Sequence, residues 1–253
     1  MISFMDQPYF YYQPGMDIWS CTSLGLVFNC SFEHSREFRR WSVFDLLSQS
    51  FVGSAACAMS QLAKRRGNFE FSDYLNQRVD VLKNSIDKYM TRIEEGKKIY
   101  LEMRLPDSNW GKEYHGMGWV CYSPVSAGWE ALDRQVLVNT IETLKRTLRI
   151  QDPNDNSLTV TMLEFDENMT ISYSVIGKFM GWDIEYCRQE KKYDEILNWC
   201  KFLEKYHSDT DILMEQINLT DGKWIKADCG NGEQCVWWCL AIARLKKEFG
   251  ISD

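Results

Sequence analysis

The sequence contains no run of about 18 apolar residues, so no segment is expected to cross a membrane as a helix. Its first residues lack the basic region and the apolar run of a secretion signal. Proline is scarce, with five in 253 residues, and neither low-complexity tracts nor internal repeats occur. These absences predict a cytoplasmic protein that is folded over most of its length.

Motifs for nucleotides and common cofactors are also absent. The sequence has no dinucleotide fingerprint and no Walker-type Gly-Lys-Ser/Thr, and Gly116 and Gly118 lie too close together for a phosphate loop. No cofactor is therefore predicted.

Positive charge is in deficit, with 29 Lys and Arg against 36 Asp and Glu and a formal net charge of −7. Residues 1–97 are neutral, so the whole acidic excess lies in residues 98–253. An acidic surface repels phosphate backbones, which argues against nucleic-acid binding. It favours a protein partner with a basic surface, because complementary charges speed association.

The nine cysteines are odd in number and belong to a chain that is not small, which predicts free thiols in a reducing cytoplasm. Cys229, Cys235 and Cys239 are separated by six and four positions, and no histidine follows them. Structural zinc sites favour Cys-x-x-Cys pairs, so no metal site is predicted.

Runs of helix and short pairs of strands predict an α+β fold in a single domain over residues 1–253. The change in charge suggests a subdomain border near residue 97. We expect an N-terminal helical pair, a small and mostly antiparallel sheet with flanking helices, and a buried C-terminal helix. The pair is predicted over 37–66, with Gly53 as a possible break, and over 72–96, with Ser72 as its cap.

Further helices are predicted from Asp133, over 190–207, and from 234 to the C-terminal end. Strands are expected at 98–104, 117–122 and 158–163, the last paired with 169–175. Asp221-Gly222 between β-compatible flanks predicts a two-residue hairpin turn.

Two opposite interpretations apply to Cys235. A cysteine in the first turn of a helix faces unpaired N–H groups, which lower its pKa and make it a better nucleophile. Gly232-Glu233-Gln234-Cys235, then Trp238 to Leu245 and Gly250-Ile251, is similar to the cysteine segment of transglutaminase-like and other papain-like folds. In the other interpretation Cys235 is an inert core thiol.

The resemblance implies a nucleophilic Cys235 in a hydrolase or acyltransferase. In those families the His and the Asp follow the Cys, whereas here only a short segment follows it. The arrangement would therefore have to be permuted, with His115 as the upstream base beside a predicted strand. Otherwise His115 is an ordinary loop residue.

Acidic turns and Trp110, the tryptophan expected to be the most exposed, give the leading hypothesis, although turn acids more often serve capping and solubility and tryptophans more often pack in a core. The acidic residues of these turns could form a patch against a basic partner. Trp110, which is flanked by turn residues, could anchor an interface. The candidate binding residues are Trp110, Asp152, Asp155, Glu164, Asp166 and Glu167. Together with the absence of a complete catalytic motif, they predict an inhibitor that binds a macromolecular partner, similar in character to immunity proteins of bacterial toxin systems or phage anti-defence proteins.

Overall fold

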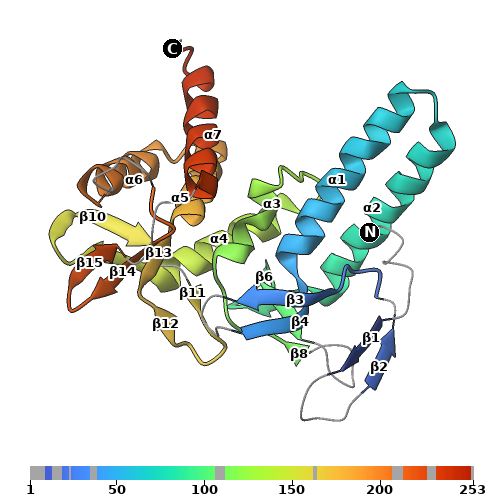
Figure 1. The fold of residues 1–253 in the computed structure, drawn as a ribbon, viewed down its shortest axis with the longest axis horizontal. Coiled ribbons are helices and arrows are strands. Elements are labelled where there is room, and N and C mark those ends of the chain that lie inside the picture. The colour runs from blue at the N-terminus through green and yellow to red at the C-terminus, as the bar shows by residue number, and fades with distance from the viewer. Residues whose placement is uncertain are drawn as a thin grey trace. The chain divides into compact units, whose positions relative to one another are not determined.

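The computed structural model describes residues 9–12, 19–22, 24–34, 39–105, 112–161, 164–206, 213–226 and 232–251 (Figure 1). It confirms the α+β class, because helices alternate with small antiparallel sheets. Two compact units are present. The first comprises residues 1–142 with 166–169, and the second 143–165 with 170–253. The predicted border near residue 97 lies within the first unit.

The first unit combines the helical pair with three small sheets. β1 pairs with β2 and β5 with β6, while the third sheet has the order β3-β4-β7-β8. Its strands are β1 (Tyr9–Tyr12), β2 (Trp19–Thr22), β3 (Asn29–His34), β4 (Arg39–Asp45), β5 (Thr91–Glu94), β6 (Lys97–Tyr100), β7 (Met103–Leu105) and β8 (Lys112–Glu113). Its helical elements are α1 (Leu46–Arg65), α2 (Phe69–Tyr89), the 3-10 helix η2 (Trp119–Tyr122), α3 (Ser123–Ser126) and the first part of α4 (Arg134–Leu148).

The helices α1 and α2 confirm the predicted antiparallel pair, with different boundaries (Figure 1). α1 begins only at Leu46, because residues 39–45 pair with β3 and β7 as a strand, and Asp45 caps the helix through Ser48 N at 2.6 Å. Asn68, and not Ser72, caps α2. Ser72 instead lies between the helices, with its hydroxyl 2.9 Å from that of Ser60.

The predicted break at Gly53 is wrong, because α1 continues through it. A Cβ at Gly53 would lie 2.4 Å from ring atoms of Trp129, which is itself buried. The glycine therefore serves close packing against this ring and does not end the helix.

Gly53→Ala should lower the free energy of unfolding by about 1–3 kcal/mol, since the Trp129 ring must move out of a packed site. This loss should appear even though alanine favours the helix by about 1 kcal/mol. Urea unfolding measures it. Gly232→Ala is the control, because a Cβ there meets no atom within 4 Å. Equal stability of both variants would contradict the packing role of Gly53.

Three further expectations meet different outcomes in the first unit. The strand at 98–104 is confirmed, but it divides into β6 and β7, which pair with different partners. The prediction of a strand at 117–122 is wrong, since residues 119–122 form the 3-10 helix η2. Asp133 caps α4 as predicted, with its carboxylate accepting from Gln135 N and Val136 N.

The second unit consists of three helices, the last part of α4 and small sheets. Its strands are β9 (Arg149–Asp152), β10 (Asp155–Thr161), β11 (Glu164–Phe165), β12 (Ile171–Ser172), β13 (Ser174–Ile176), β14 (Gln216–Thr220) and β15 (Lys223–Lys226). Its complete helices are α5 (Gly177–Gln189), α6 (Tyr193–Tyr206) and α7 (Gly232–Glu248). β10 pairs with β9, and not with 169–175 as predicted. The hairpin at Asp221-Gly222 is confirmed, and both residues have the positive φ of a type I′ turn.

The central helix of the second unit is α5, which the sequence did not reveal. Ten of its thirteen residues are buried. In α7 only Gln234 and Ala241 are buried, so the prediction of a buried C-terminal helix is wrong for most of its length. α7 packs on α5 where Gly181 lets Trp237 approach closely, and the rings of Trp182 and Trp237 meet edge to face at 5.5 Å.

Within the described ranges, no helix has the length and apolar character that a membrane span requires. The six cysteine side chains that can be described are free thiols, as expected; they are Cys57, Cys121, Cys187, Cys200, Cys235 and Cys239.

Candidate functional site

Two of the candidate acidic residues are not available for an acidic patch. Asp152 and Glu164 have no exposed surface, so their side chains cannot contact a partner. Asp155 belongs to the second unit, whereas Asp166 and Glu167 belong to the first. Trp110 lies outside the described residues.

The proposed catalytic pair is divided between the units. His115 is an exposed residue of the first unit, and its carbonyl accepts a hydrogen bond from Arg92 at 3.1 Å. Cys235 is half-buried in the first turn of α7 in the second unit. The position of Cys235 near the start of a helix agrees with the sequence analysis, whereas its role as a nucleophile and its pairing with His115 stay predictions.

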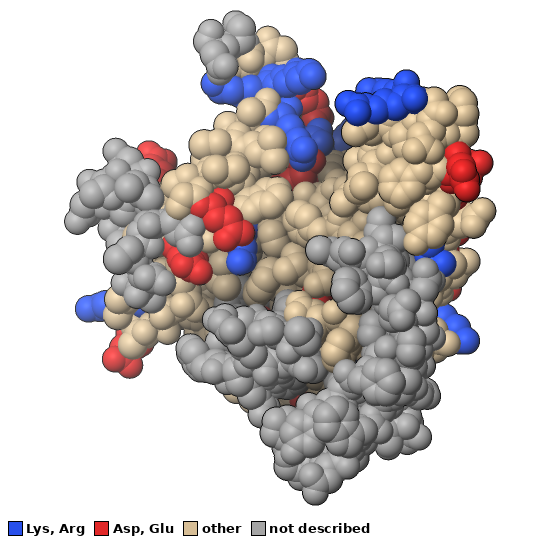
Figure 2. Space-filling view, turned by 45° about the vertical axis from the view of Figure 1, so that its right-hand side comes forward, with Lys and Arg blue, Asp and Glu red and all other residues tan. Residues whose placement is uncertain are grey.

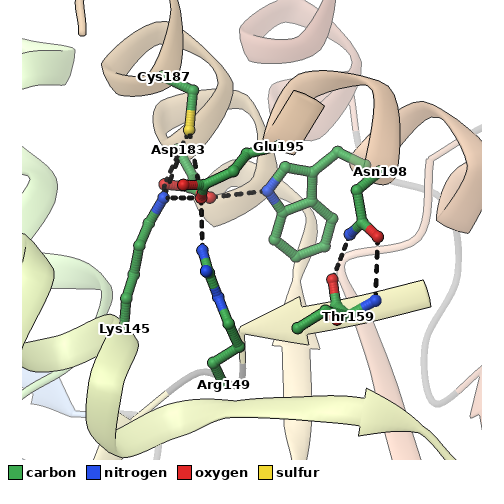
Figure 3. Close-up of polar contacts among 8 residues, drawn as sticks. Lys145, Arg149, Thr159, Asp183, Cys187, Glu195 and Asn198 are labelled. Atoms are coloured by element: carbon green, nitrogen blue, oxygen red, sulfur yellow. Dashed lines mark hydrogen bonds and ion pairs between the residues drawn. The ribbon is translucent and has the colours of Figure 1, made fainter. Parts of the chain in front are cut away.

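A buried charged cluster lies in the second unit, where three helices meet (Figure 3). Lys145 extends from the last turn of α4, and its ammonium is 2.7 Å from both Asp183 of α5 and Glu195 of α6. Cys187, one turn after Asp183, places its sulfur 3.3 Å from Lys145 Nζ. The side chains of Lys145 and Asp183 are 3% and 1% exposed. We call these four residues the Lys145 cluster.

Outer contacts hold the carboxylates of the cluster in place. Trp199 Nε1 donates to Asp183 at 2.7 Å, and Arg149 forms an ion pair with Glu195 at the exposed side. Asn198 of α6 exchanges hydrogen bonds with the backbone of Thr159 in β10. These contacts fix α6 against both α5 and the β9-β10 hairpin (Figure 3).

The electrostatics of the cluster favour a charged Lys145 amine and a charged Glu195 carboxylate. Burial alone would lower the pKa of Lys145, but Asp183, Cys187 and Glu195 together raise it above its ordinary value. For Glu195, burial alone would raise the pKa, but the charge of Lys145 lowers it below its ordinary value. For Cys187, burial and the neighbouring Asp183 raise the pKa of the thiol.

This arrangement disfavours chemistry at the cluster. A thiol with a raised pKa remains protonated at neutral pH and is a poor nucleophile. The ligand atoms of Asp183, Cys187 and Glu195 lie within 4.8 Å of one another, as a metal would require. The Lys145 ammonium, however, already contacts both carboxylates, and a metal would first have to expel it. The Lys145 cluster is therefore a buried ionic link between helices.

An exposed apolar surface lies on the helical pair of the first unit. Six large side chains of α1 and α2 are between 36% and 53% exposed, and each directly precedes a buried residue. They are Phe51, Met59, Leu62, Phe71, Tyr74 and Val81, and we call them the hairpin face. Phe71 and Tyr74 are stacked, with ring centroids 6.3 Å apart.

Met59 and Phe71 project to the same side of the helical pair. Ser60 of α1 and Ser72 of α2 contact each other between the helices, so each of these two residues faces the opposite helix. A residue one position earlier is rotated by about 100° about its helix axis. Because α1 and α2 are antiparallel, these rotations carry Met59 and Phe71 toward one common side.

Comparison with known proteins gives a likeness of fold alone. No protein-family model matches the chain, and no curated protein matches it. Among solved structures, a bacterial glucoamylase in complex with acarbose is similar, with a TM-score of 0.59 and 10% sequence identity. The match covers 80% of this chain and 33% of the glucoamylase chain, so this chain spans about a third of that protein.

Proposed function

We propose that this protein binds another protein through the hairpin face and acts as its inhibitor. The exposure of six large apolar side chains on α1 and α2 carries the proposal. Large contiguous apolar patches are uncommon on a protein that has no partner, and on this face Phe71 and Tyr74 stack on each other. Aromatic residues and methionine are also the types enriched at the centres of interfaces.

The charges of the chain indicate the partner's surface. The hairpin face belongs to the neutral residues 1–97, so its contact with a partner is apolar. The acidic excess of residues 98–253 favours a partner that also carries basic surface, because opposite charges speed the encounter. The partner that fits is a basic protein with an apolar docking area.

Leu62→Asp combined with Phe71→Asp should weaken binding by at least about 100-fold, because both changes place a charge in the centre of an apolar contact. Partners recovered with the unaltered chain would be identified by mass spectrometry and then purified. Binding to the purified partner would be measured by calorimetry, and the partner's own activity would be assayed. The unaltered protein should suppress that activity, and the double variant should not.

The matched control is Ile93→Asp combined with Met169→Asp. Both residues belong to the first unit, are more than half exposed and lie outside the hairpin face. The control should bind the partner as the unaltered chain does. Equal loss in both double variants would contradict the proposal, and so would a homodimer that only the hairpin-face variant abolishes. Loss of function in both Cys235→Ser and His115→Ala, with partner binding intact, would favour the hydrolase alternative.

A further inference from the structure

The second unit has an open pocket of about 600 Å³ between the end of α5 and the C-terminal half of α7. This volume is within the usual range for small-molecule sites. Its lining consists of Arg188, Gln189, Lys191, Arg244, Lys247 and Glu248. Four cations and one carboxylate make this a local positive site on a chain of net charge −7. Figure 2 shows basic side chains gathered over the C-terminal end of α7.

Two carboxylates hold the arginines of the pocket in position. Glu185, nearly buried in α5, accepts two hydrogen bonds from Arg188, at 2.9 and 3.0 Å, and pairs with Arg244 at 3.1 Å. Glu248 of α7 accepts from Arg188 Nη1 at 2.7 Å. The hydrogen bond from Arg188 also lowers the pKa of Glu248, so this carboxylate remains charged at neutral pH. The guanidinium groups are thus preorganised by the fold.

Hydrogen-bond donors remain available for a ligand. A guanidinium has five N–H groups, and the contacts of Arg188 with Glu185 and Glu248 use three of them. Lys191 and Lys247 add two ammonium groups from different segments of the lining. Fixed guanidinium forks beside ammonium groups match the geometry and charge of phosphate oxygens.

Helix dipoles account for only part of this arrangement. Cations favour the last turn of a helix, which explains Arg188 in α5 and Lys247 in α7. Lys191 lies beyond α5, in a left-handed backbone conformation with φ of 56°, and Arg244 precedes the last turn of α7. Helix dipoles alone therefore do not explain their convergence with Arg188 on one cavity.

We infer that this pocket binds a small molecule that carries a phosphate or polyphosphate group. The cations of the lining hold the phosphate oxygens. An exposed aromatic ring lies next to the lining, because Phe249 follows Glu248 and packs edge to face on Tyr193 at 5.2 Å. A planar group attached to the phosphate would stack there, as bases do on aromatic side chains. The pocket belongs to the second unit, whereas the hairpin face belongs to the first.

Calorimetric titration with ATP and with sodium pyrophosphate, at about 0.1 M salt to screen distant charges, tests the site. Saturable binding at one site is expected. Lys191→Glu combined with Lys247→Glu should weaken it by at least about 100-fold, since each lost charge-assisted contact is worth roughly tenfold. Tighter binding of ATP than of pyrophosphate would support stacking on Phe249. Equal affinities would support recognition of the phosphates alone.

The control with the same change in net charge is Lys201→Glu combined with Lys223→Glu. Both lysines are exposed in the second unit and do not line the pocket. This variant should keep its affinity within about threefold, a difference below 1 kcal/mol. If Lys191→Glu with Lys247→Glu does not fold, as judged by circular dichroism, Lys191→Gln with Lys247→Gln should still weaken binding by at least about tenfold. Equal weakening in pocket and control variants, or no saturable binding of either probe, would overturn the inference.

Discussion

Replacing Lys145 with methionine should lower the free energy of unfolding by about 3–5 kcal/mol, the usual cost of removing one partner from a buried ion pair. Asp183, only 1% exposed, would lose the ammonium 2.7 Å from its carboxylate. Methionine fills a similar volume, so the loss reports charge and not a cavity. Urea unfolding followed by tryptophan fluorescence measures it, and Trp199 lies within the affected region.

A nearby cation provides the control for this prediction. Arg149 also pairs with Glu195, but its side chain is 40% exposed. Arg149→Met should therefore cost at most about 1 kcal/mol, as is usual for exposed ion pairs. The double variant Lys145→Met with Asp183→Leu should recover part of the stability that Lys145→Met loses, because no unpaired charge remains at Asp183. If Lys145→Met costs no more than Arg149→Met, the cluster is not a stabilising ionic link.

The elements that the sequence predicted well depend on local signals. The apolar stripe of α2, the cap of α4 at Asp133 and the hairpin at Asp221-Gly222 each involve residues a few positions apart. Their physical causes, a helical repeat, an N-cap hydrogen bond and a positive φ, act within the segment itself. Such elements form wherever the segment is placed in the fold.

The helix α5 lacked a signal of this kind because it is buried on nearly every side. A helix surrounded by other elements has no polar face, so its apolar residues show no clear period. Asp183 and Glu185 interrupt the apolar run and suggest exposure, yet both are buried and pair with cations of other helices, Asp183 with Lys145 of α4 and Glu185 with Arg244 of α7. Only the tertiary structure reveals these partners.

The Lys145 cluster was unpredictable for a related reason. Lys145 lies in the last turn of α4, where a lysine ordinarily faces water and complements the helix dipole. Its partners Asp183 and Glu195 follow 38 and 50 residues later in the chain. These charges meet because three helices pack around one site. No spacing in the sequence indicates that they do so.

The exposure of α7 shows the limit of apolar content as a sign of burial. Its apolar residues on nearly all sides favoured a core helix, yet Val236 and Leu240 are 64% and 38% exposed. An amphipathic pattern can also overestimate burial, since Leu62 of the helical pair is 53% exposed. Sequence pattern identifies the apolar residues of a helix, whereas neighbouring elements decide which of them are covered.

Asp152 should prove to be a residue of stability and not of binding. Its buried carboxylate accepts hydrogen bonds from Tyr206 Oη at 2.7 Å, Trp224 Nε1 at 3.2 Å and Asn154 N at 2.8 Å. Asp152→Ala removes all three acceptor contacts at once and leaves these donors without their acceptor. We expect a loss of about 2–4 kcal/mol in the free energy of unfolding, measured by urea denaturation.

Asp155 is the matched control, because it belongs to the same turn and was predicted to join the same acidic patch. It is only partly covered, and its main contacts are to Ser157 and Lys205. Asp155→Ala should leave the unfolding midpoint close to that of the unaltered chain.

Below the unfolding transition, folded Asp152→Ala protein should bind a partner with unchanged affinity, since a buried carboxylate makes no contact across an interface. A large loss of affinity in folded Asp152→Ala protein, with stability unchanged, would restore Asp152 as a contact residue and contradict its burial.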